Sequence, residues 1–130
     1  MTAHADLRVK ALFGVYGKER DAWIAQSKIV LNVHYYNVKI FEAVRISYLL
    51  NNRVIVLSEE SGINPYQGVA IPMTSYENIE AEIRRYLSDD GLRDRTRIEN
   101  YEQFKAGYSM RDLLGKVISR WEVSPSPRIQ

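Results

Sequence analysis

Short apolar runs alternate with longer segments of helical periodicity through the first half of the chain. Runs rich in valine, isoleucine and leucine occur at 7–13, 29–33, 54–57 and 68–72, and each stops at a glycine, a proline or a polar residue. The runs at 29–33 and 54–57 are nearly continuous, which is typical of strands buried on both faces of a parallel sheet. Because proline cannot donate to a strand ladder, Pro72 favours an edge position for the last run. The pattern therefore predicts about four short, mostly parallel strands.

Helical periodicity fills the intervals between these runs. The segment 18–26 is predicted to be a short helix and the segment 38–51 a longer one. In the longer segment, apolar side chains recur at three- and four-residue spacing, which marks one face of a helix. They are Ile40, Phe41, Val44, Tyr48 and Leu49. Strands that alternate with helices in this way indicate βαβ units.

The last third of the chain is predicted to be helical. Thr74 and Glu77 have the spacing of a capping box, and apolar residues at helical intervals follow them. A second helix is expected over 92–105, mostly exposed because it is dense in arginine and glutamate. A third helix, opening near Ser109, carries an apolar stripe. The stripe consists of Leu113, Leu114, Val117, Ile118 and Trp121.

These elements amount to a single α/β domain. We expect one Rossmann-like domain over 1–123, with a helical C-terminal third, and a flexible tail over 124–130. Pro125 and Pro127 cannot continue a helix, which is why the tail is separated from the domain. A chain of 130 residues is long enough to bury one hydrophobic core.

Composition removes several classes of function. The 18 basic and 16 acidic residues give a formal charge of +2 without a basic stripe, which disfavours nucleic-acid binding. The absence of cysteine excludes disulfides, zinc–thiolate sites and thiol catalysis, and only two histidines disfavour a histidine-built metal site. No apolar run is long enough for a membrane span or a leader peptide. We expect a cytoplasmic protein without a metal or cofactor.

Three loops follow predicted strands, at 14–18, 34–37 and 58–64. Ligands of parallel sheets bind at the carboxyl ends of the strands, where these loops begin. The first loop holds Gly14, Gly17 and Lys18, whose backbone amides and charge can contact a phosphate. The loop matches neither a Walker motif nor a dinucleotide fingerprint, and a simple turn at a helix start explains the same residues. Because the preceding run ends in Phe13 rather than in acidic residues, a response-regulator receiver domain is disfavoured.

The second loop places an imidazole and two aromatic rings, those of His34, Tyr35 and Tyr36, between a strand and a helix. A helix N-terminus favours an anion, to which an imidazole can donate. A buried loop with satisfied polar groups explains these residues equally well.

Three acidic residues, Glu42, Glu59 and Glu60, lie near the same loops. The carboxylate of Glu42, in the first turn of a predicted helix, suits the adjacent hydroxyls of a ribose. The alternatives for Glu42 are a favourable interaction with the helix dipole and an ion pair with Arg45 at i+3. Glu59 and Glu60 follow a strand, and we expect them to be solvated loop residues.

The segment 27–59, SKIVLNVHYYNVKIFEAVRISYLLNNRVIVLSE, resembles the donor-binding half of GT-B glycosyltransferases, in particular the bacterial "glycosyl transferases group 1" families. The similarity lies in a strand at 29–33, a polar loop, a helix beginning Phe41-Glu42-Ala43 and a strand at 54–57. The resemblance implies a Rossmann-like domain that takes part in transferring a sugar from a nucleotide-sugar, usually without a bound metal.

The same resemblance implies a set of donor-binding residues. They are His34, Tyr35, Tyr36, Asn37, Val38, Phe41 and Glu42. Glu42 corresponds to the residue that holds the ribose of a UDP- or GDP-linked donor, and the amides around Asn37 and Val38 face the diphosphate or the sugar. Retaining members of the family carry a further glutamate eight residues before the ribose-binding one, and this chain has His34 there.

The family's donor domain usually begins with two further strand–helix units and follows an acceptor-binding domain, and neither precedes Leu7. Because such catalysis needs a site enclosed between two domains, we expect no transferase turnover from this chain alone. An unpaired strand at 7–13 and the apolar stripe of the last helix favour a homodimer. The alternative interpretation is a non-catalytic nucleotide-binding or protein-interaction module with the same sheet.

Overall fold

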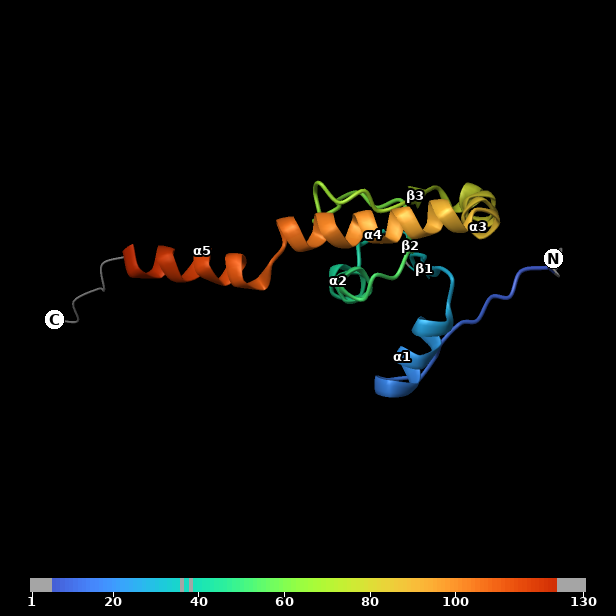
Figure 1. Ribbon diagram of the computed structural model, residues 1–130, viewed down its shortest axis with the longest axis horizontal. Coiled ribbons are helices and arrows are strands. Elements are labelled where there is room, and N and C mark those ends of the chain that lie inside the picture. The colour runs from blue at the N-terminus through green and yellow to red at the C-terminus, as the bar shows by residue number, and fades with distance from the viewer. Residues whose placement is uncertain (1–5, 36, 38, 124–130) are drawn as a thin grey trace.

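The computed structural model describes residues 6–35, 37 and 39–123, which form an α/β arrangement (Figure 1). The elements run in the order α1 (Gly17–Gln26), β1 (Val30–Asn32), α2 (Ala43–Asn51), β2 (Val56–Glu59), β3 (Met73–Thr74), the 3-10 helix η1 (Tyr76–Asn78), α3 (Ile79–Ser88), α4 (Asp90–Gly107) and α5 (Met110–Val123). No helix in this part of the chain is long and apolar enough to cross a membrane. The tail expected at 124–130 lies outside the described residues.

The three strands form one parallel sheet in the order β1-β2-β3. Val30 faces Val56 across the first pair, and Ser58 faces Met73 across the second. Every residue of β2 is buried because it is the central strand and helices cover both of its faces. Val56 packs in the cluster beneath α2, whereas Leu57 points to the opposite face, the side on which α3 lies against β2.

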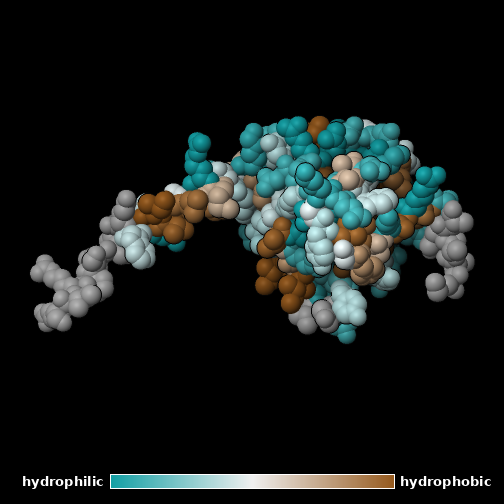
Figure 2. Space-filling model, turned by 90° about the horizontal axis from the view of Figure 1, so that it is seen from below, coloured by the Kyte–Doolittle hydropathy of each residue, from teal (hydrophilic) through white to brown (hydrophobic). Residues whose placement is uncertain are grey.

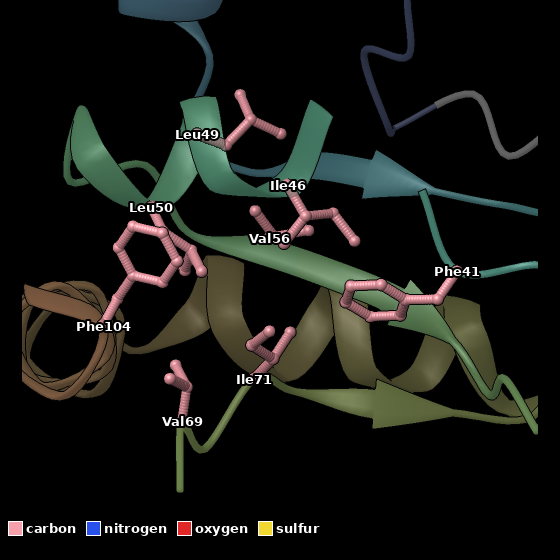
Figure 3. Packing of buried hydrophobic residues seen from close by; sticks show 8 residues of the cluster. All are labelled: Phe41, Ile46, Leu49, Leu50, Val56, Val69, Ile71 and Phe104. Carbon is pink, nitrogen blue, oxygen red and sulfur yellow. The ribbon is translucent and has the colours of Figure 1, made fainter. Parts of the chain in front are cut away.

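The main core lies between α2, α4 and the sheet, where side chains from these elements point toward one another (Figure 3). Ile46, Leu49 and Leu50 of α2 belong to one buried cluster with Val56 of β2 and Phe104 of α4, and the ring of Phe104 lies beside Leu50. The three α2 side chains are each at most 1% exposed. Full burial of an aliphatic side chain contributes about 1.5–3 kcal/mol. The contact therefore fixes α2 firmly on β2.

A group of aromatic rings anchors the start of α2. The ring centroids of Phe41 and Tyr66 are 5.8 Å apart, and Tyr66 also lies edge-on to Phe104 at 5.1 Å and to Tyr108 at 5.0 Å. The hydroxyl of Tyr66 donates to the backbone carbonyl of Ala43 at 2.8 Å. The first turn of α2 is thus held by the loop after β2 and by α4.

The prediction of about four strands is wrong by one, because no strand forms over 7–13 among the described residues. Polar side chains attach this part of the chain to two helices instead. Asp6, just before the segment, pairs with Arg84 of α3 at 2.5 Å, and Lys10 lies 3.2 Å from the ring centre of Trp23 in α1. Val9 and Phe13 are 69% and 88% exposed. Alternating apolar residues form a strand only where a sheet edge accepts them.

The helix predicted over 38–51 begins later than expected, at Ala43. Lys39 has a φ of 50°, a left-handed conformation that does not belong to a right-handed helix. Ile40 therefore lies before the helix and is 69% exposed, and Val44 is 87% exposed. The buried stripe of the shorter helix falls on the α2 core residues instead of on Ile40 and Val44. Of the predicted stripe, Phe41 and Leu49 are buried.

The strand predicted over 68–72 forms immediately after Pro72, at Met73–Thr74. Pro72 lacks an N–H group, but its carbonyl accepts the backbone N–H of Ser58 at 2.9 Å. β3 is an edge strand of this sheet, as the proline predicted.

The three C-terminal helices form as predicted, with small shifts of their ends. No side-chain cap opens α3, although Thr74 and Glu77 have capping-box spacing; the helix starts from η1 instead. α5 extends away from the rest of the molecule (Figure 1), and its apolar stripe forms an exposed brown patch on that arm (Figure 2). The exposed fractions of this stripe run from 41% at Leu113 to 83% at Trp121.

Candidate functional site

The carboxyl ends of β1 and β2 lie side by side because the two strands are parallel and in register. Asn32, the last residue of β1, faces Ser58 of β2, and both side chains are fully buried. The Nδ2 atom of Asn32 donates to the Oγ atom of Ser58 at 2.9 Å. Strand register thus brings two polar side chains together beneath the loops that leave this edge.

From this buried pair a chain of contacts leads outward to Glu42. Arg45, in the first turn of α2, donates to the Oδ1 atom of Asn32 and also pairs with Glu42 at 3.1 Å. Glu42 is the N-cap position of α2, and its side chain makes no capping hydrogen bond. Its carboxylate is 45% exposed. An acceptor with two oxygens is therefore held at the sheet edge and still faces solvent.

Glu59, the last residue of β2, organises the other half of the edge. It is only 6% exposed, and it accepts the backbone N–H of His34 at 3.0 Å and the ammonium group of Lys39 at 3.3 Å. The hydrogen bond from His34, helped by Lys39, holds the pKa of Glu59 below its ordinary value against the opposing effect of burial. The expectation of a solvated Glu59 is wrong, whereas Glu60 is exposed as predicted.

The imidazole of His34 is held from the loop after β2. The Oγ atom of Ser61 lies 2.8 Å from its Nε2 atom. Together with the bond from its backbone N–H to Glu59, this contact fixes both the backbone and the ring of His34 beside β2. The loop after β1 is therefore attached to the neighbouring strand at two points.

The other predicted residues of this loop differ in their surroundings. Tyr35 is 90% exposed and Asn37 is also exposed, so both face solvent at the sheet edge. Phe41 packs in the core and supports the start of α2 from below. Tyr36 and Val38 lie outside the described residues.

The glycine loop predicted as a phosphate contact lies apart from this edge. Gly14 and Gly17 adopt φ angles of 65° and 56°, and Lys18 is exposed in the first turn of α1. Figure 1 shows this turn at the end of α1 that points away from the sheet. Because the run before Gly14 forms no strand, the loop does not follow the carboxyl end of one.

The sequence predicts Arg45 only as an ion-pair partner of Glu42. The structure adds a hydrogen bond from its guanidinium to Asn32, which links Glu42 to the buried end of β1. The signal that could have identified Glu59 and Asn32 is their place at the end of an apolar run, where two parallel strands stop together. Sequence composition does not distinguish the buried Glu59 from the exposed Glu60, because both lie in a segment rich in glycine, proline and polar residues.

The assembled edge presents one half-exposed carboxylate, two half-exposed cations and an imidazole, contributed by Glu42, Arg45, Lys39 and His34. Such a set can accept hydrogen bonds from sugar hydroxyls and donate to anionic oxygens. Among the described residues, no three acidic or histidine side chains gather closely enough to hold a metal ion.

Comparison of the chain with protein-family models, with curated proteins and with solved structures gives no match.

Proposed function

We propose that this chain binds a nucleotide-sugar at the carboxyl edge of its sheet, as the donor-binding part of a glycosyltransferase. The observation that carries the proposal is the position of Glu42. Its carboxylate stands at the start of α2, half exposed, and Arg45 links it to the buried Asn32. The two oxygens of such a carboxylate accept the two adjacent hydroxyls of a ribose.

Positive charge near Glu42 can interact with the diphosphate of a nucleotide-sugar. Lys39 pairs with Glu59 and remains 49% exposed, so its ammonium group has further N–H donors for a diphosphate. The positive end of the α2 dipole lies at the same edge. Glu59, in contrast, is already engaged with His34 and Lys39, and its role is to hold the loop.

Calorimetric titration with UDP, GDP and their sugar conjugates tests the proposal. The wild-type chain should bind one of the nucleotides, and Glu42→Ala should weaken binding about 10–100-fold, the range expected for lost hydrogen bonds to a charged group. Glu19→Ala, which removes an exposed acid on α1, is the matched control and should bind like the wild type.

Two results would reject the proposal. One is the absence of binding to every nucleotide tested, which favours the interpretation as a protein-interaction module. The other is binding that Glu42→Ala leaves unchanged, since the ribose would then be held elsewhere.

A further inference from the structure

A polar hollow lies at the opposite edge of the sheet, at the amino ends of β1 and β2. It is open to solvent and has a volume of about 390 Å³ between the end of α1, the turn after α2 and the first half of α4. A volume of this size lies within the range of small-molecule sites. The residues proposed to bind the nucleotide-sugar do not line it.

Four cationic side chains from three separate segments meet around this hollow: Lys28, Arg53, Arg93 and Arg97. Two carboxylates offset part of the charge. Asp90 pairs with Arg93 at 2.6 Å, and Asp94, which also lines the hollow, pairs with Arg97 at 2.8 Å. Four cations and two carboxylates leave an excess of two positive charges at one place, as large as the formal charge of the whole chain.

Arg53 stands where backbone geometry favours glycine. The N–H of Val54 bonds to the carbonyl of Leu49 at 3.0 Å and the N–H of Arg53 to that of Leu50 at 3.1 Å, which is the Schellman pattern at the end of α2. The position of Arg53 in this pattern is usually glycine, because φ is positive, and here it is 54°. A side chain other than glycine is uncommon at a positive φ, and such a residue often has a functional role that offsets the strain of its backbone. The guanidinium of Arg53 lies 4.4 Å from the ring centre of Tyr101, and Arg53 is one of the residues that line the hollow.

Aliphatic residues also line the hollow: Ile24 and Ala25 of α1, and Val54 and Ile55, which precede β2. Cationic and aliphatic residues around one hollow suit a ligand with an anionic head and an organic body. Guanidinium groups match phosphate oxygens especially well, because their paired N–H groups form two parallel hydrogen bonds.

We propose that this hollow binds a small organic phosphate. A nucleic acid is a poorer fit, because it needs an extended basic surface, and the arginines of α4 alternate with acids outside the hollow. The proposal is independent of the nucleotide-sugar site, which occupies the other edge of the sheet.

Titration of the ¹⁵N-labelled chain with phenyl phosphate and with inorganic phosphate, at constant ionic strength, tests the proposal. Amide shifts are expected at Lys28, Arg53 and Arg97, with phenyl phosphate binding more tightly than inorganic phosphate because of the aliphatic residues in the lining. Arg53→Gly should weaken binding about tenfold or more, as expected for a lost charge-assisted contact. This variant suits the left-handed backbone, so its fold is expected to remain intact.

Arg97→Gln provides a second variant that leaves the turn after α2 unchanged, and it should weaken binding as Arg53→Gly does. Arg95→Gln removes the same charge from α4 outside the hollow and should leave binding unchanged. The proposal is overturned if the shifts spread over all basic residues, if they fall at the carboxyl edge, or if Arg53→Gly has no more effect than Arg95→Gln. Binding of an oligo-glutamate peptide in place of phenyl phosphate would also overturn it and indicate a protein partner.

Discussion

Replacement of Glu59 by alanine tests how the candidate site is held together. The substitution removes a buried carboxylate that accepts the backbone N–H of His34 at 3.0 Å and pairs with Lys39 at 3.3 Å. A hydrogen bond to a charged group contributes about 1.5–3 kcal/mol. A half-exposed ion pair such as the one with Lys39 adds roughly 0.5 kcal/mol. We therefore expect Glu59→Ala to lower the free energy of unfolding by about 2–3.5 kcal/mol.

Urea denaturation followed by circular dichroism at pH 7 measures this loss. Glu59→Gln keeps an oxygen that can accept from His34 but loses the charge, so its cost should be about 1 kcal/mol. Glu60→Ala is the matched control, because Glu60 is the exposed neighbour and such surface changes usually stay within about 0.5 kcal/mol. Equal stability of Glu59→Ala and Glu60→Ala would refute the reasoning.

The same residue predicts a pH dependence. The pKa of Glu59 is lower in the folded chain than its ordinary value, chiefly because of the hydrogen bond from His34. The carboxylate therefore stabilises the fold at neutral pH, and this contribution is lost as the pH falls through the lowered pKa. The stability difference between the wild type and Glu59→Gln should accordingly shrink over the interval in which the pH falls from the ordinary pKa of a glutamate through the lowered one. A difference that stays constant over this interval would contradict the assignment.

The core and the last helix give further predictions. Ile46→Ala should cost about 2–5 kcal/mol in urea denaturation, because the side chain is fully buried, whereas Val44→Ala, two residues away on the exposed face of α2, should change stability by less than about 0.5 kcal/mol. Self-association through α5 stays a prediction from its exposed apolar stripe. Sedimentation velocity should show a concentration-dependent dimer that Ile118→Ser together with Trp121→Ser disrupts, and a wild-type chain that is monomeric at high concentration would contradict it.

The central part of the fold could be predicted because its signals are local. The runs 29–33 and 54–57 contain β1 and β2 because continuous apolar residues suit strands covered on both faces. In the run 7–13 apolar residues alternate with Arg8 and Lys10, a pattern that fits a half-buried strand. A strand also needs a free partner edge, which sequence composition does not reveal. The predicted stripe of α2 includes Ile40, which lies outside the helix because the helix begins at Ala43. The face that packs on the sheet carries Ile46, whereas Val44 lies on the opposite face and is exposed.

The candidate site could be predicted only where one residue carries the signal. Glu42 at a helix start and His34 after a strand were identified, and the structure brings both to the carboxyl edge of the sheet. Asn32 and Glu59 belong to the site because the register of β1 and β2 brings the ends of the two strands together. Arg45 belongs to it because its guanidinium contacts Asn32 from α2. Contacts of this kind depend on tertiary packing, which the spacing of residues along the chain does not contain.

Titration of the ¹⁵N-labelled chain with UDP and with GDP tests the central claim most directly, because it shows where a nucleotide binds. The account predicts that one nucleotide shifts the amides of His34, Asn37 and Glu42 and that Glu42→Ala removes these shifts. Shifts confined to Lys28 and Arg53 at the opposite edge, or a spectrum that neither nucleotide changes, would contradict the nucleotide-sugar site.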